Sequence, residues 1–238
     1  KLYDEALQVL RPLQNVKFVY ERNLARYRMG LVYNAKDKFK ESLEMYEKVI
    51  RDGELKEEDN PTSLTGKTKA TKSNLKREAL TDSVKAYTTV YKKDPDPVGY
   101  YSKLAPTEAL FQGVIEKLGM RYITMKKFDI AVKLLRTLGE RIVDPQRVVN
   151  IYQEVLLMIP LKDRINIPIG ETRYFLEKFN SWVSLYDVPP KTRKLAYTFF
   201  EKQVRDLATR IHEMSKTAPK DKKPKFLAMA RDYYHLYL

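Results

Sequence analysis

The segment Gly66-Lys67-Thr68 matches the end of a phosphate-binding loop, one of three groups in this sequence whose residue types could carry chemistry. Such a loop also requires a glycine five residues before the final glycine and a buried strand upstream, because its backbone amides must surround the phosphates. Pro61 occupies that glycine position, and residues 54–60, which are polar except for Leu55, stand where the strand would lie. The sequence therefore does not predict a nucleotide site.

The two histidines do not complete a metal site. A zincin helix carries a second histidine four residues after the first, with a glutamate between them as general base. His212-Glu213 is followed at that position by Lys216, and His235 lies among tyrosines, where a core or stacking role is expected. The chain has no cysteine, which excludes disulfides, thiolate metal sites and cysteine nucleophiles. We predict no metal and no cofactor.

Paired carboxylates form the third group. Glu57-Glu58 lies in a polar stretch and is expected to be solvated, whereas general acid–base catalysis requires an enclosed site that shifts a pKa. The aromatic residues recur at packing intervals and are interpreted as core. The sequence therefore predicts a protein without catalytic activity.

Composition sets broader limits. The 238 residues are 43% apolar, with 8 glycines and no apolar run of the length that spans a membrane. The net charge is +14, and Lys191 to Leu238 holds twelve basic and five acidic residues. A basic balance suggests nucleic acid, anionic lipid or an acidic protein as partner. The alternative is a lysine-rich surface without a specific partner.

Two segments, residues 23–56 and 112–145, share one pattern of residue types. Each has a glycine, then a tyrosine three residues later, an aromatic residue six further on and a small residue after three more. These positions are Gly30, Tyr33, Phe39 and Ser42 in the first segment, and Gly119, Tyr122, Phe128 and Ala131 in the second. Small residues let two helices approach closely, and the aromatic residues fill the gaps between neighbouring pairs.

This pattern resembles the tetratricopeptide repeat, in which a helix A and a helix B form each unit. The resemblance implies an all-α fold, a right-handed α-α superhelix of antiparallel helix pairs, continuous over residues 1–238. Residues 1–22 are expected to end a preceding repeat, 57–111 to hold an insertion and a divergent repeat, and 146–238 to form degenerate helical repeats. The chain opens within a repeat, so we expect a fragment that further repeats precede and follow.

In the divergent and degenerate parts, helical periodicity and proline positions predict the helices. In the longest of them, Leu195, Phe199, Leu207 and Ile211 are expected to point inward. A basic loop is predicted over 216–224. The predicted helices span 75–92, 98–104, 146–158, 169–179, 191–216 and 226–238.

Several segments are similar to large tetratricopeptide proteins of deltaproteobacteria, which include periplasmic and outer-membrane-associated proteins of the adventurous gliding machinery. These segments are residues 75–87, Tyr152-Gln153, 171–176, 206–212 with Lys216-Thr217, and 232–238. The resemblance implies a scaffold for protein partners in the bacterial cell envelope, periplasmic or associated with the outer membrane, with a cytoplasmic protein as the alternative. It does not imply gliding.

In a tetratricopeptide fold, helix A lines the concave face, so the repeat register predicts a partner-binding surface. Helix-A positions 5, 9 and 12 are Tyr27, Leu31 and Asn34 in the first segment, and Glu116, Met120 and Ile123 in the second. An extended or helical segment of a partner is the expected ligand. The alternative site is the basic loop with Lys220, Lys222, Lys223 and Lys225, and the alternative function is binding of nucleic acid or another anionic polymer.

Overall fold

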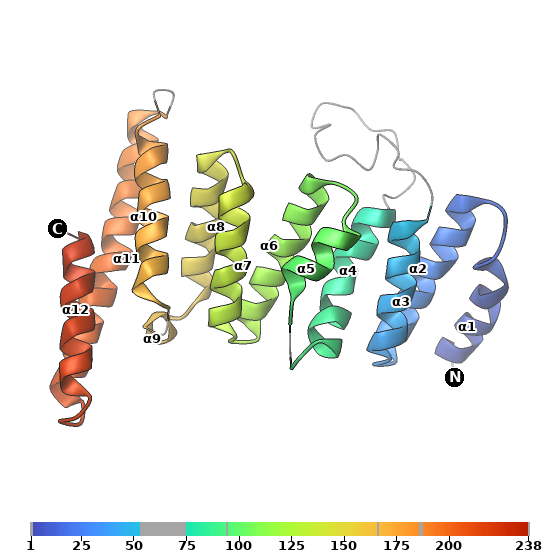
Figure 1. The fold of residues 1–238 in the computed structure, drawn as a ribbon, viewed down its shortest axis with the longest axis horizontal. Coiled ribbons are helices and arrows are strands. Elements are labelled where there is room, and N and C mark those ends of the chain that lie inside the picture. The colour runs from blue at the N-terminus through green and yellow to red at the C-terminus, as the bar shows by residue number, and fades with distance from the viewer. Residues whose placement is uncertain (1, 53–74, 94, 166, 186–187, 238) are drawn as a thin grey trace. The chain divides into compact units, whose positions relative to one another are not determined.

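The computed structural model describes residues 2–52, 75–93, 95–165, 167–185 and 188–237 (Figure 1), and these residues form helices and connections without a strand. The chain divides into two compact units, unit 1 from Lys1 to Arg121 and unit 2 from Tyr122 to Leu238. The all-α prediction is therefore confirmed. The helices are α1 (Leu2–Leu13), α2 (Val19–Ala35), α3 (Phe39–Arg51), α4 (Leu75–Val90), α5 (Pro97–Leu104), α6 (Glu108–Thr124), α7 (Phe128–Arg141), α8 (Pro145–Met158), α9 (Leu161–Arg164), α10 (Ile169–Val183), α11 (Pro190–Thr217) and α12 (Lys223–Tyr237).

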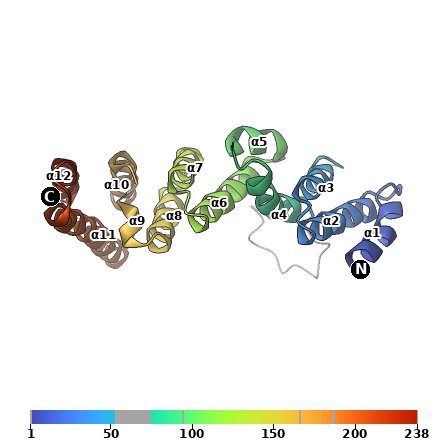
Figure 2. The ribbon, with the colours of Figure 1, turned by 90° about the horizontal axis from the view of Figure 1, so that it is seen from below.

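In unit 1, α2 and α3 pack closely at the glycine of the repeated pattern. The ring of Tyr46 lies directly over Gly30, and the hydroxyl of Ser42 donates a hydrogen bond to the carbonyl oxygen of Gly30 at 2.8 Å. Tyr46 and Ser42 are fully buried. The small residues of the pattern therefore allow close helix contact in this pair. Figure 2 shows α3 and α5 on one side of α2 and α4.

The turns that follow α2 and α6 have the same backbone geometry. The amide of Lys38 donates to the carbonyl of Tyr33 at 2.9 Å, and the amide of Lys127 donates to the carbonyl of Tyr122 at 2.8 Å. In each turn the residue before this donor has a left-handed φ, 56° in the first and 59° in the second. This is the Schellman arrangement of a helix end. The two segments that share a sequence pattern therefore also share a turn.

An aspartate-proline pair begins two of the helices. Asp96 precedes α5 and accepts a hydrogen bond from the amide of Gly99 at 2.9 Å, and Asp144 precedes α8 and accepts one from the amide of Gln146 at 2.9 Å. The proline that follows each aspartate stands in the first turn, where a missing N–H costs nothing.

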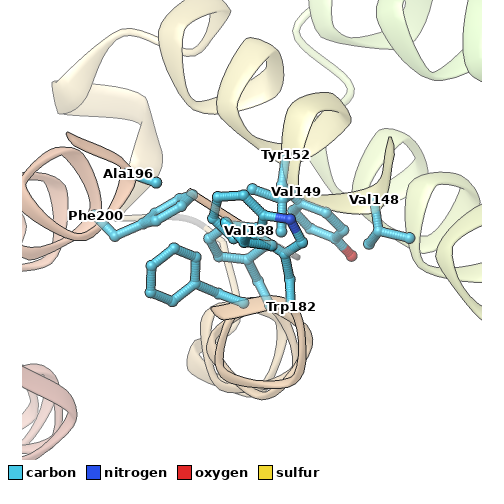
Figure 3. Packing of buried hydrophobic residues seen from close by; sticks show 9 residues of the cluster. Val148, Val149, Tyr152, Trp182, Val188, Ala196 and Phe200 are labelled. Atoms are coloured by element: carbon cyan, nitrogen blue, oxygen red, sulfur yellow. The ribbon is translucent and has the colours of Figure 1, made fainter. Parts of the chain in front are cut away.

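Unit 2 has an aromatic core between α8, α10 and α11. Figure 3 shows Tyr152 of α8, Trp182 of α10 and Phe200 of α11 in one cluster, together with Val148, Val149, Val188 and Ala196. A second apolar cluster joins α11 to α12, with Leu207, Ile211 and Tyr233 buried in it. The aromatic residues of these two clusters therefore act as core, as predicted, whereas Tyr197 is 61% exposed.

The structure corrects the predicted inward face at the start of α11. Leu195 is 64% exposed and Phe199 is half-buried, whereas Ala196 and Phe200 are buried. The buried stripe is shifted by one residue and continues through Val204. Most predicted helix ends differ from the structure by one or two residues; the main exceptions are that α10 continues to Val183, α12 begins at Lys223, and the short α9 was not predicted.

An ion-pair cluster ties the start of α2 to the end of α3. Asp52 accepts two hydrogen bonds from Arg22, at 2.6 and 2.8 Å, and one from Arg26. The Arg22 guanidinium holds the pKa of Asp52 below its ordinary value, and Arg26 adds to this effect. The cluster is partly exposed, with 21% of the Asp52 side chain accessible.

Because the Asp52 pKa is lowered on folding, its contribution to stability is present above the ordinary aspartate pKa and is lost as the pH falls through the lower, folded value. We expect Asp52→Asn to reduce the unfolding free energy of unit 1 by about 1–2 kcal/mol at pH 7, and the difference from wild type to be smaller at about pH 2. Urea unfolding followed by circular dichroism at both pH values measures this. Asp221→Asn, at an exposed aspartate, should change neither value.

Candidate functional site

The polar surface of α2, α4 and α6 in unit 1 is the best-defined candidate for partner binding. We call it the helix-A surface and define it by Tyr27, Leu31, Asp82 and Lys117. The Tyr27 hydroxyl donates to Oδ2 of Asp82 at 2.7 Å, and Nζ of Lys117 lies 3.9 Å from Oδ1 of the same carboxylate. One aspartate thus links side chains from three helices.

Tyr27 is held in place within the fold. Its ring lies 6.0 Å from the Tyr46 ring, and burial together with the bond to Asp82 raises the pKa of its hydroxyl above the ordinary tyrosine value. Tyr27 was predicted to line the partner-binding surface, and in the structure its hydroxyl is already bonded to Asp82. The structure gives it a positioning role, because it fixes the carboxylate of Asp82 at the surface.

The other predicted groove residues divide by exposure. Leu31 is 40% exposed, one turn after Tyr27 on α2, so its apolar side chain is available to a ligand. Asn34, Glu116 and Met120 are half-buried. Ile123 is 4% exposed and belongs to unit 2, so it is part of the packed interior and cannot line the surface as predicted.

Two residues of the helix-A surface, Asp82 and Lys117, were absent from the predicted set. Glu78, Asp82 and Lys85 are spaced at helical intervals along α4 and mark its polar face. That signal identifies a solvated stripe, but it does not say which neighbouring helix the stripe meets. Arg121 adds a second α4–α6 contact, donating from Nε to Oγ1 of Thr88 at 2.9 Å.

The alternative basic site is exposed, but it is only in part a loop. Lys220 and Lys222 lie in the turn between α11 and α12, whereas Lys223 and Lys225 lie in the first turn of α12. The predicted loop was too long because α12 begins three residues earlier than expected. All four side chains are exposed and remain available to an anionic partner.

Among the residues considered for catalysis, those that the structure describes do not gather into a site. His212 is exposed, with its ring 6.2 Å from the Tyr234 ring. His235 is exposed too, so of the two roles expected for it, core or stacking, the core role is wrong. Gly66-Lys67-Thr68 and Glu57-Glu58 lie outside the described residues. Within the described part of the chain, histidine and acidic side chains form no group that could hold a metal ion.

None of the helices that the structure describes combines the length and apolar character that crossing a bilayer requires. Comparisons of the chain with protein-family models and with curated proteins found no match.

Proposed function

We propose that this chain is a non-catalytic scaffold for protein–protein interaction, built as a tetratricopeptide-type right-handed superhelix. The support is the sequence pattern that occurs twice, together with the Schellman turn that lies within both copies and the close α2–α3 contact at Gly30. Stacked helix pairs of this kind offer an extended surface to a partner.

The observation that carries the proposal is the linkage of Tyr27, Asp82 and Lys117 across α2, α4 and α6. A half-buried hydrogen bond fixes the carboxylate before a ligand arrives, which lowers the entropy lost on binding. Leu31 adds an exposed apolar contact beside this polar row. An apolar anchor beside fixed polar groups suits an extended or helical peptide segment.

The proposal places the scaffold in the bacterial cell envelope as part of a multiprotein assembly, with the cytoplasm as the alternative. Only the sequence resemblance supports this location. Cell fractionation with an antibody against the chain tests this location, because a scaffold of the envelope should be recovered in the periplasmic or membrane fraction.

The helix-A surface is tested with peptides selected from a phage-displayed random library on the wild-type chain. We expect Leu31→Asp and Lys117→Glu each to lower the affinity for the selected peptides at least tenfold, because each change removes a contact at the surface or reverses its charge. Both side chains are substantially exposed, so the melting temperature should stay nearly unchanged. Fluorescence anisotropy of a labelled peptide gives the affinity.

Lys48→Glu is the matched control, since it makes the same charge change at an exposed position of helix α3. It should leave peptide affinity within about twofold of wild type. Equal losses in Lys48→Glu and Lys117→Glu would mean that net charge, and not the helix-A surface, governs binding.

Binding of an anionic polymer is the second candidate, favoured by the exposed Lys220, Lys222, Lys223 and Lys225. Backbone-phosphate binding loses orders of magnitude in affinity between about 50 and 200 mM salt. Binding of random-sequence DNA and RNA is measured over this salt range, in wild type and in a variant with these four lysines changed to glutamine. The measurement distinguishes binding of an anionic polymer from the scaffold function.

A further inference from the structure

Unit 2 contains a cavity of about 50 Å³ that has no part in the proposed scaffold function. Val155, Phe175, Phe200 and Val204 form much of its apolar wall, while Arg164 and Glu171 contribute charged groups. Since a water molecule needs about 10–15 Å³ in this measure, the space holds about four waters or a ligand of similar size.

Arg164 is a buried cation without an acidic partner. The residue is only 9% exposed; its Nε donates to the carbonyl of Ile159 at 2.8 Å and its Nη1 donates to Gln203. Among the described residues, no carboxylate lies within ion-pair distance of its guanidinium. Burial lowers the pKa of Arg164, and the more distant Asp206 opposes this effect. A buried charge without a counter-ion is costly, so the site favours an anion.

Glu171 does not supply that anion. Its Oε1 lies 3.1 Å from Nη1 of Arg136, which compensates its charge, and its Oε2 is buried without a hydrogen-bond partner. The Arg136 guanidinium also binds Glu140, whose Oε1 lies 3.4 Å from its Nε. The charged groups at this cavity and their partners are therefore two guanidinium groups and two carboxylates, and both carboxylates pair with Arg136. One positive charge, that of Arg164, remains unpaired.

We propose that this cavity binds a small aliphatic monocarboxylate, whose carboxylate pairs with Arg164 and whose alkyl group contacts Val155, Phe200 and Val204. The planar guanidinium matches the geometry of a carboxylate. The apolar wall distinguishes this ligand from an inorganic anion, which would gain nothing from it. The volume limits the ligand to two or three carbon atoms.

Sodium acetate is the probe, at a constant ionic strength set with sodium chloride. Saturation-transfer NMR on the whole chain should show transfer to the acetate methyl group, and propionate should displace it whereas benzoate should not. Arg164→Gln should weaken acetate binding at least tenfold. Glu171→Gln should tighten it two- to fivefold, because it removes a negative charge beside the ligand.

Val204→Leu keeps Arg164 and adds one methylene to the cavity wall, so it should weaken acetate binding at least fivefold. Far-UV circular dichroism shows whether each variant is folded. If Arg164→Gln does not fold, the Val204→Leu result tests the proposal. The proposal is wrong if wild type transfers no saturation to acetate, which would mean that the cavity holds only water. It is also wrong if transfer is unchanged in Val204→Leu.

Discussion

Replacing Gly30 by alanine is expected to lower the unfolding free energy of unit 1 by about 1–3 kcal/mol, and replacing it by leucine to lower it further. A β-carbon at Gly30 would lie 2.7 Å from Cε1 and 3.0 Å from Cδ1 of Tyr46. The Tyr46 ring is fully buried and packs against Tyr27, so it has little room to move. Relief of the clash must therefore separate α2 from α3.

Gly113 supplies the control for this prediction. It also stands inside a helix of unit 1, but a β-carbon there would meet nothing within 4 Å. Gly113→Ala should therefore stabilise the protein by about 1 kcal/mol, the difference in helix propensity. Urea unfolding followed by circular dichroism measures both variants. A stabilised Gly30→Ala would contradict the close α2–α3 contact.

The α2–α3 pair was predictable from the repeated pattern, because the pattern depends on contacts within one helix pair. Gly30 and Ser42 are twelve residues apart, and a short turn fixes how their helices meet. Phe39 and Phe128 begin α3 and α7, as the pattern requires. Local spacing therefore determines this part of the fold.

The buried face of α11 was not predictable in the same way. Leu195 and Phe199 have the same four-residue spacing as Ala196 and Phe200, and both pairs contain an aromatic residue. When neighbouring positions are both apolar, periodicity does not determine which of the two is buried. The packing of Phe175 and Phe179 against Phe200 decides between them, and that information lies on α10.

The sequence named two residues of the candidate surface, Tyr27 and Leu31, but none of its contacts. The repeat register places Tyr27 and Leu31 on helix A, and the structure leaves Leu31 exposed. The bond from Tyr27 to Asp82 spans 55 residues and joins the first patterned segment to the segment that was interpreted as a divergent repeat. Because the divergent repeat lacks the pattern, no register could align Asp82 with Tyr27.

Phe200 is a position of close contact in the core of unit 2, as Gly30 is between α2 and α3 of unit 1. The Phe200 ring lies 4.4 Å from the Phe175 ring and 4.6 Å from the Phe179 ring, and the residue is 2% exposed. Trp182 is 1% exposed in the same cluster and is the only tryptophan of the sequence. Its emission therefore reports on unfolding of unit 2.

Phe200→Ala is expected to destabilise unit 2 by about 3–5 kcal/mol, because it removes a buried ring and leaves a cavity that the surrounding aromatic side chains cannot fill. Phe199→Ala makes the same chemical change one residue earlier on α11, where the side chain is only half-buried, and should cost less than about 1.5 kcal/mol. Helix propensity changes equally in both variants, so their difference isolates the burial of the ring. Urea titration followed by Trp182 emission measures the two free energies. Equal losses at the two positions, or a larger loss in Phe199→Ala, would show that the buried stripe of α11 runs through Leu195 and Phe199 after all.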